Sequence, residues 1–441
     1  MIETHLSILG GGPAGLAVGY FASKKGVPFT IYEASAEIGG NARTLRRGEF
    51  LFDTGAHRWH DKDAEITQEL FNLMGNDLHK VEAPSQTYHN RKFIDFPLSP
   101  LNLFLTLGPD VFFRAGFDFL RSRLGAETDA EHFEAFAVRT YGRTIASRFL
   151  LNYSEKLWGA PCDRLSPKIA GRRLKGLDLK TFLTEVFLGR QAKAEHLDGV
   201  FYYPVKGIGA IPERLAERCG WQNIRTNSAV TRVFHDGARI AAIEINGKDR
   251  IPAQHVISTL PVSLFLKLMD PAPSPEILAA AGALRFRNLR LVVLCIGRDR
   301  VSPNASVYFP DPEHPFTRVY EPKNRSRAMA PAGKTSLVAE VPCQPEDALW
   351  RMEEAELARL VAGKFVETGW IKPEEIIDAA AYRIPNAYPI IELGGEGKTS
   401  LIMGYLGGFG NLSVSGRSGR FMYTHLHDMM RFGKDIVEGL F

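Results

Sequence analysis

The sequence contains little cysteine, and its cysteines show no spacing typical of a metal or redox site. Only four cysteines occur among the 441 residues, at Cys162, Cys219, Cys295 and Cys343. They lie far apart and form no CxxC pair, so the spacing of a thiolate metal site is absent. We expect buried, reduced thiols in a cytoplasmic protein without a bound metal.

The sequence also lacks a strong charge excess and a long uninterrupted apolar run. A formal net charge of +4, without a basic run, does not favour nucleic-acid binding. The N-terminus leads directly into an apolar strand, so no secretory signal is predicted. The most apolar stretch, residues 96–125, contains Pro109, Asp110, Arg114 and Asp118 and cannot form a membrane-spanning helix. We expect packed helices there; contact with a membrane surface is the alternative, and the oligomeric state is left open.

A dinucleotide-binding pattern is present at the start of the chain. In the segment ILGGGPAG, Gly10, Gly12 and Gly15 fill the three glycine positions of a GxGxxG turn between an apolar strand and a helix. The first glycine permits a tight turn, the second lets the backbone reach a pyrophosphate, and the third allows close packing of helix on strand. Pro13 and Ala14 begin that helix, whose N-terminus favours a phosphate group.

A second segment continues this pattern. Glu33 ends the strand FTIYE about 20 residues after the turn, where a carboxylate accepts hydrogen bonds from ribose hydroxyls. Gly39 and Gly40 allow the backbone to run beside a dinucleotide, with Asn41 next to them, and Arg43 offers a charged fork to its phosphates. An ordinary turn with a solvated arginine is the alternative. The segment resembles the GG-box of the glutathione-reductase-like FAD-binding fold rather than an NAD dehydrogenase.

Residues 230–259, which begin at Val230, extend the resemblance. Short alternating strands are broken by Asp236-Gly237 and Asn246-Gly247, which are strong hairpin signals. This stretch resembles the three-stranded meander and returning strand of the same FAD-binding fold.

The C-terminal segment supplies a third part of the pattern. Gly416 and Arg417 precede a helix that includes Leu426 and runs to the end of the chain. The start of such a helix suits the pyrimidine edge of a flavin, where negative charge collects on reduction. Because no cysteine lies in this segment, we predict FAD that is bound non-covalently.

The chain is long enough for two domains with sizeable cores. We expect an α/β protein in which a Rossmann-type FAD-binding domain is interleaved with a mixed α+β substrate domain. The FAD-binding domain would comprise residues 1–80, 196–265 and 390–441. The substrate domain would comprise residues 81–195, mainly helical, and 266–389, with mixed sheet and helix.

Two histidines follow the FAD segments directly. His57 and His60 bracket Arg58 and Trp59. A His-x-x-His pair can bind metal, but no third ligand is evident. We expect both histidines near the isoalloxazine ring, where either could shuttle a proton near neutral pH.

A later segment carries candidate substrate-binding residues. Tyr153 and Lys156 share a face of a predicted helix, and Trp158 leads into a glycine loop. Lys156 is a candidate partner for an anion and Trp158 for a flat ring; a helix end with an aromatic plug is the alternative. Arg172 and Arg173 are adjacent forks for phosphate or carboxylate, unless they are simply solvated.

Two further candidates lie near the C-terminal half of the chain. Arg318 and Glu321 lie on or near a predicted strand, where a cross-strand salt bridge is the simplest account of the arginine. Tyr423 stands just before the C-terminal helix and is expected close to the flavin.

Several of these segments together resemble UDP-galactopyranose mutases. GAHRWH is similar to their Gly-x-His-x-aromatic-His segment, and YSEKLWG to their uridine and diphosphate loop. TRVYE resembles the strand whose arginine contacts the substrate diphosphate, and GRSGRFMY a segment near the flavin. The resemblance implies that His57 or His60 lies beside the flavin ring. It further implies that aromatic and basic side chains hold a nucleotide sugar: Tyr153, Trp158, Arg172, Arg318 and Tyr423.

The same segments also resemble bacterial FAD-dependent oxidoreductases of the protoporphyrinogen-oxidase-like and amine-oxidase-like branch. The chain has RRLKGLDLKTFL where mutases have an apolar-Pro-apolar-Arg run. It reads THLHDMM after Tyr423, where mutases place Asp-Met almost at once. These differences favour the oxidoreductase branch.

Three functions follow from these patterns. The leading hypothesis is a flavin-dependent oxidoreductase that takes a hydride from a substrate C–H bond onto N5 of FAD, with nucleotide-linked sugars among the candidate substrates. The first alternative is a mutase-like, non-redox isomerase that uses reduced FAD, with Arg172 and Arg318 neutralising a diphosphate leaving group. The second alternative is an FAD-binding protein without turnover.

Overall fold

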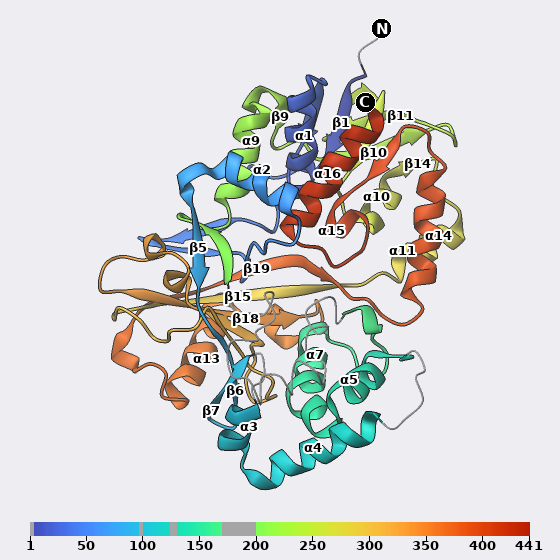
Figure 1. The fold of residues 1–441 in the computed structure, drawn as a ribbon. Coiled ribbons are helices and arrows are strands. Elements are labelled where there is room, and N and C mark those ends of the chain that lie inside the picture. Colours follow the sequence, from blue (N-terminus) through green and yellow to red (C-terminus); the bar gives the residue numbers. More distant parts are fainter. Residues whose placement is uncertain (1–3, 97–99, 124–129, 170–199) are drawn as a thin grey trace.

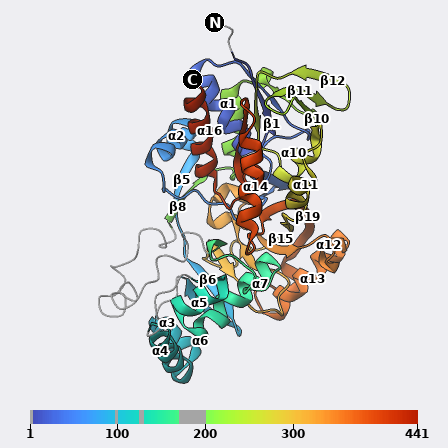
Figure 2. The ribbon, with the colours of Figure 1, turned by 90° about the vertical axis from the view of Figure 1, so that its right-hand side faces the viewer.

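The computed structural model describes residues 4–96, 100–123, 130–169 and 200–441. A five-stranded sheet lies near the N-terminus, and a seven-stranded sheet crosses the middle of the molecule (Figure 1). The helices between residues 100 and 158 lie at the end opposite the N-terminus, as the side view also shows (Figure 2).

The five-stranded sheet is parallel and is built from distant parts of the sequence. Its strand order is β20 (Leu412–Val414), β13 (His255–Ser258), β1 (Leu6–Leu9), β2 (Phe29–Tyr32) and β9 (Ile224–Arg225). All four neighbouring pairs are parallel. Every residue of β1 is buried, because other elements cover both faces of the sheet. The sheet therefore has the interleaved composition that the sequence predicts.

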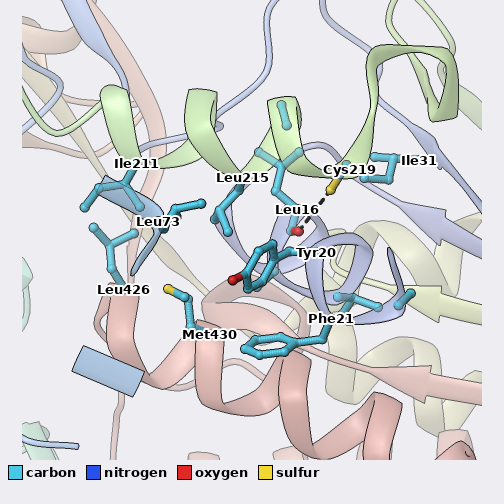
Figure 3. Packing of buried hydrophobic residues seen from close by; sticks show 14 of the residues in the cluster. Leu16, Tyr20, Phe21, Ile31, Leu73, Ile211, Leu215, Cys219, Leu426 and Met430 are labelled. Atoms are coloured by element: carbon cyan, nitrogen blue, oxygen red, sulfur yellow. Dashed lines mark hydrogen bonds between the residues drawn. The ribbon is translucent and has the colours of Figure 1, made fainter. Parts of the chain in front are cut away.

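Three helices cover one face of this sheet. They are α1 (Pro13–Lys25), α9 (Ala210–Cys219) and α16 (Leu426–Leu440). In the cluster between them, Leu16 of α1, Leu215 of α9 and Met430 of α16 pack together (Figure 3). A Cβ atom on Gly433 would lie 2.9 Å from the carbonyl carbon of Ala17, so a glycine in α16 lets the two helices pack closely.

A smaller sheet covers part of the other face. It contains the antiparallel strands β10 (Val230–His235), β11 (Ile240–Ile245) and β12 (Asp249–Pro252), and the parallel strand β14 (Met269–Asp270). The first three strands form the meander that the sequence predicts. Asn246 and Gly247 have φ values of +54° and +69°, which the turn between β11 and β12 requires.

The seven-stranded sheet joins strands from both halves of the chain. Its order is β19 (Ile376–Pro389), β15 (Phe286–Ile296), β18 (Thr335–Cys343), β17 (Arg318–Tyr320), β16 (Ser306–Tyr308), β6 (Ser85–His89) and β7 (Lys92–Phe96). One face is apolar: Val292, Leu337 and Val341 pack against Leu357 and Phe365 of α13 (Glu354–Glu367).

The opposite face of the sheet packs toward the dinucleotide segments and carries polar groups at its centre. Leu291 and Tyr320 form an apolar cluster with Phe52 of β4 (Phe50–Asp53). Glu340 and Arg318, which point to the same side as Tyr320, interrupt this cluster. Because this face packs toward the dinucleotide segments, residues of the two sheets come close together here.

Residues 78–96 form strands, although they lie partly in the range that the sequence predicts to be mainly helical. They are β5 (Leu78–Glu82), β6 and β7. β6 reads SQTYH, a short polar sequence that becomes a strand because it pairs with β16 and β7.

Helices follow these strands, as the sequence predicts. They are α3 (Pro100–Leu107), α4 (Pro109–Arg123), α5 (Phe133–Tyr141), α6 (Arg143–Ile145) and α7 (Asn152–Trp158). None of the helices in the described parts of the chain combines the length and apolar content that crossing a bilayer requires.

Candidate functional site

The two glycine segments lie against each other at the N-terminus of α1. A Cβ atom on Gly15 would lie 1.9 Å from the carbonyl oxygen of Gly10, so only glycine permits this approach of helix and turn. A Cβ atom on Gly40 would lie 3.3 Å from the Cα of Gly12. Gly39 and Gly40 have φ values of +98° and +52°, which favour glycine. The two turns therefore meet with no side chain between them.

Charged side chains lie at both sides of this turn. The Glu33 carboxylate accepts hydrogen bonds from the N–H of Gly11 at 2.7 Å and from the N–H of Ser35 at 2.9 Å. The Nη1 atom of Arg43 donates to Glu37 at 2.5 Å. Among the described residues, Arg43 Nε has no hydrogen-bond partner although it is buried.

The C-terminal segment closes the same region. Gly416, with φ of +82°, lies so near α1 that a Cβ atom would be 2.8 Å from the Cβ of Ala14. Arg417 donates to the carbonyl oxygens of Thr424 and Ala387 at 3.0 and 3.1 Å. In this structure Arg417 fixes the loop before α16, and its predicted contact with the cofactor stays a prediction.

The two other predicted cofactor residues lie nearby in the fold. Val230 begins β10 two residues after Ser228, whose N–H donates to the carbonyl oxygen of Glu33 at 2.8 Å. Leu426 is the buried first residue of α16.

The residues that meet here fit a dinucleotide. No side chain caps the first turn of α1, which begins at Pro13, so its backbone N–H groups remain for a phosphate. The Glu33 carboxylate, next to that turn, suits ribose hydroxyls. The buried Nε of Arg43 is a further donor without a protein partner among the described residues. The local sequence patterns thus bring groups that suit a phosphate and a ribose into one region, and their cofactor contacts stay predictions.

His57 connects this region to the seven-stranded sheet. Its Nε2 atom donates to the carbonyl oxygen of Asn41 at 2.9 Å, and its side chain is partly exposed. Burial, with help from the charge of Arg417, lowers the pKa of His57 to about 4. The imidazole is therefore neutral near pH 7, and its predicted part in proton transfer stays a prediction.

The three residues after His57 lie in other surroundings. The Nη2 atom of Arg58 donates to Ser306 Oγ at 2.7 Å. Trp59 is fully buried in the cluster beneath α1. The ring of His60 lies 6.2 Å from that of Phe201. Its predicted place beside the flavin stays a prediction.

Arg318 forms a buried ion pair, and its partner is Glu340. The Nε and Nη2 atoms donate to the two carboxylate oxygens at 2.8 and 2.7 Å. Arg318 is 9% exposed and Glu340 is 1% exposed, so the pair is shielded from water. Burial alone would raise the pKa of Glu340, but the charge and hydrogen bonds of Arg318 outweigh it and lower this pKa.

Glu321 does not take part in this pair. Its carboxylate accepts from the N–H groups of Val301 and Ser302 at 3.0 and 2.9 Å and from Thr335 Oγ1 at 2.7 Å. The cross-strand salt bridge that the sequence suggests for Arg318 thus exists, but with Glu340 on the neighbouring strand.

Aromatic side chains lie around Arg318. Tyr308 is directly opposite Arg318 across β16 and β17, and its ring meets the edge of Tyr153 at 5.8 Å. Arg318 interacts electrostatically with Tyr153 and with Tyr388. The structure therefore brings two of the predicted substrate residues, Tyr153 and Arg318, into one region.

A second aromatic group continues toward the C-terminal helix. The rings of Trp158 and Tyr423 lie 5.9 Å apart, and each lies 6.1 Å from Tyr388. The guanidinium group of Arg417 lies over the rings of Tyr388 and Tyr423. Trp158 and Tyr423, far apart in the sequence, are therefore neighbours next to the C-terminal segment that contains Arg417.

Lys156 points elsewhere. Its Nζ atom donates to the carbonyl oxygens of Asp311 and His314 at 2.8 and 3.1 Å. Burial lowers the pKa of Lys156 to about 7. Its predicted substrate contact stays a prediction, as do those of Arg172 and Arg173, which lie outside the described residues.

Sequence reasoning missed three residues of this site. Glu340 carried a signal, because it is a single acid in the apolar strand TSLVAEVPC. Tyr388 lies in a strand with one other tyrosine, Tyr382, and had no distinctive signal. Arg325, which is buried and donates to the carbonyl oxygen of His57 at 2.8 Å, follows a polar turn, where nothing in the pattern indicates this contact.

Known proteins resemble different parts of this chain. The 4,4'-diapophytoene desaturase of Methylomonas sp is 32% identical over 121 residues, which cover 27% of this chain and 21% of that protein. Protoporphyrinogen oxidase 1 of Arabidopsis thaliana, a chloroplastic protein, is 24% identical over 298 residues, which cover 61% of this chain and 55% of that protein. The chain thus spans about a fifth and about half of the length of these two relatives.

The fold as a whole resembles a solved structure closely. The crystal structure of a reduced UDP-galactopyranose mutase matches with a TM-score of 0.87 and 19% identity, over 100% of this chain and 95% of that one. This likeness confirms the predicted fold class. Because the chain also matches the flavin-containing amine oxidoreductases over residues 13–385, it belongs to that family.

Proposed function

We propose that the protein is an FAD-dependent oxidoreductase that binds FAD non-covalently and holds an anionic group of a small-molecule substrate at Arg318. The observation that carries this proposal is the place of Arg318. Its partner Glu340 contacts the N–H of Ala56, and the next residue, His57, contacts Asn41 in the dinucleotide segment. A substrate at Arg318 would therefore lie beside the cofactor.

The residues at the N-terminus of α1 would hold the cofactor. Gly12 and Gly40 leave room for the pyrophosphate, Glu33 accepts from a ribose, and Arg43 supplies positive charge. When bound, FAD supplies an acceptor for a hydride from a substrate C–H bond.

The remaining residues bind and orient the substrate. Arg318 binds Glu340 through Nε and Nη2, so its third nitrogen, Nη1, is available to an anion. Tyr153 and Tyr423, both partly exposed, offer aromatic surfaces for a flat or sugar-like group beside the buried Trp158, so nucleotide-linked sugars are the substrate class that we favour. His57 is neutral at pH 7, and we assign proton transfer to water.

The proposal is tested with purified protein in two steps. We expect a yellow protein whose flavin spectrum bleaches anaerobically when a substrate is added. Candidate amines, porphyrinogens, polyenes and nucleotide sugars form the screen. A colourless protein that takes up no FAD contradicts the cofactor, and a yellow protein that none of these compounds bleaches supports the hypothesis of binding without turnover.

The role of Arg318 has its own test. Arg318→Ala is expected to weaken an anionic ligand by about 2–5 kcal/mol, because a buried charged partner is lost. Arg47→Ala is the matched control, since Arg47 pairs with Asp378 on the exposed surface. If Arg318→Ala loses less than about 0.5 kcal/mol of ligand-binding free energy, the arginine serves only its salt bridge with Glu340.

A non-redox mutase is the second candidate, and the whole-chain likeness to reduced UDP-galactopyranose mutase favours it. In that case activity appears only after the flavin is reduced. Arg318 would neutralise the charge that develops on a diphosphate leaving group. Calorimetry that shows no UDP binding to the reduced protein would eliminate this candidate.

A further inference from the structure

The segment from Asp53 to His57 makes three hydrogen bonds, two accepted and one donated, with side chains on the side of the seven-stranded sheet. The hydroxyl of Tyr320 donates to the carbonyl oxygen of Asp53 at 2.6 Å. The N–H of Ala56 donates to Glu340 Oε1 at 2.7 Å. Arg325 Nη1 donates to the carbonyl oxygen of His57 at 2.8 Å. Three backbone groups within five residues are thus fixed by side chains of another part of the fold.

Arg325 is itself held in one position. It is 3% exposed, and its guanidinium group lies 4.5 Å from the centre of the Tyr320 ring. Its Nη2 atom also donates to the carbonyl oxygen of Ala305 at 3.3 Å. A planar guanidinium group can make these bonds together, whereas an ammonium group at the end of a flexible stem cannot reproduce the fork.

The other side of the same loop contacts the dinucleotide segment. Thr54 Oγ1 donates to the carbonyl oxygen of Asn41 at 2.8 Å. The N–H of Thr54 donates to the carbonyl oxygen of Arg43 at 2.9 Å. His57 Nε2 also donates to Asn41. The loop therefore lies between the sheet and the residues that follow Gly40.

Glu340 joins this loop to the ion pair. Its Oε1 atom accepts both from Arg318 Nη2 and from the N–H of Ala56, each at 2.7 Å. An anion that draws Arg318 toward itself weakens the first bond, and the shared oxygen then moves relative to Ala56. The same carboxylate thus responds to a ligand and holds the loop.

We propose that Glu340 and Arg325 are positioning residues that set the loop at Ala56 and His57 beside the flavin, and that Glu340 transmits the occupation of Arg318 to that loop. The inference rests on the proposed function, because it requires FAD at the dinucleotide segment and an anion at Arg318. Through this link, substrate binding at Arg318 changes the surroundings of the flavin before any reaction occurs.

Conservative variants of the FAD-loaded protein test the positioning. Arg325→Lys keeps the charge and loses the fork, and Glu340→Gln keeps an oxygen for Ala56 and loses the charge. The matched controls are Arg327→Lys and Glu346→Gln, whose side chains are exposed. We expect each site variant to change the ratio of oxidised to reduced flavin in a fixed redox buffer by about fivefold, the factor that one hydrogen bond contributes. The controls should leave this ratio unchanged.

Inorganic pyrophosphate tests the transmission. In the wild-type protein we expect pyrophosphate to shift the flavin absorption spectrum, and in Glu340→Gln we expect it to bind with little shift, as calorimetry would show. Equal shifts in both proteins, pyrophosphate binding without a shift in the wild type, or no pyrophosphate binding would overturn the transmission. Unchanged flavin ratios in Arg325→Lys and Glu340→Gln would overturn the positioning.

The outcomes separate this inference from the proposed function. A protein that binds no FAD contradicts the proposed function itself. A yellow protein with normal turnover and unchanged flavin properties in both variants contradicts only the inference. If a variant fails to fold, Tyr320→Phe, which removes one hydroxyl from the same loop, gives the same redox measurement with a smaller change in packing.

Discussion

The two faces of the seven-stranded sheet differ in what their residues do. Ala339 and Val341 of β18 point to one face and pack with Leu357 and Phe365 of α13. Glu340, between them, points to the other face and binds Arg318 and Ala56. Adjacent residues of one strand thus serve a core and a candidate site, because successive side chains point to opposite faces.

The difference shows why the site can contain buried charges. The face toward α13 buries a large apolar cluster, which contributes to the stability of the sheet. The opposite face can therefore keep an ion pair whose desolvation would otherwise offset its attraction. We expect changes on the apolar face to affect stability alone, and changes on the polar face to affect both stability and ligand or flavin properties.

The largest expected effect is on the polar face. Glu340→Ala should lower the free energy of unfolding by about 3–5 kcal/mol, because it leaves Arg318 buried without its partner. Chemical unfolding measures this change. The double variant Arg318→Met/Glu340→Leu should recover most of the stability and still lose affinity for anions. A Glu340→Ala protein as stable as the wild type would contradict the buried pair.

The next effect is on the apolar face. Leu337, 1% exposed, lies opposite Leu294 in the register of β15 and β18. Leu337→Ala should lower the free energy of unfolding by about 2–5 kcal/mol, through lost burial and the cavity left behind. The flavin spectrum and ligand affinity of the folded protein should stay as in the wild type. A changed spectrum would show that the two faces are not separate.

His57 gives a smaller effect that depends on pH. Its pKa is about 4 in the folded protein and 6.5 when unperturbed, so the unfolded chain takes up the proton first as pH falls. The stability associated with the neutral ring is complete above pH about 6.5 and decreases below it. Between pH 7 and 5 the wild type should lose about 1–2 kcal/mol more than His57→Gln. Parallel pH profiles of thermal unfolding would contradict the lowered pKa.

The smallest effect concerns Tyr320, which lies on the polar face. Tyr320→Phe removes the hydrogen bond to the carbonyl oxygen of Asp53 and keeps the ring. We expect a loss of about 0.5–1.5 kcal/mol in the free energy of unfolding. The exposed pair of Arg47 and Asp378 is the comparison, because Arg47→Ala should cost less. A larger loss of unfolding free energy in Arg47→Ala than in Tyr320→Phe would contradict the expectation that the buried contact contributes more.

The region around the N-terminus of α1 was predictable because its signals are local. Gly15 must be glycine because it faces the carbonyl oxygen of Gly10 five residues earlier, and the φ of +98° at Gly39 is set within its own turn. The strand that leads into Glu33 and the hairpin turn at Asn246 are likewise set by short-range patterns. These patterns gave the fold class and the family, and their cofactor contacts remain predictions.

The arrangement of the candidate substrate residues was predictable only in part. The sequence indicated Tyr153, Trp158 and Arg318, and the structure places them near one another. No sequence pattern indicated that Lys156 would point toward the carbonyl oxygens of Asp311 and His314. That direction depends on a loop about 155 positions away in the chain, so no local pattern records it.

The amino-acid sequence by itself determined the turns, the parallel strands and the acidic and basic side chains that a dinucleotide requires. These features follow from backbone conformation and hydrophobic periodicity, which act over a few residues. Only the tertiary structure decided that Glu340, and not Glu321, pairs with Arg318, and that Arg325 reaches His57. Strand register and burial determine these pairings, and both exist only once distant segments have packed together.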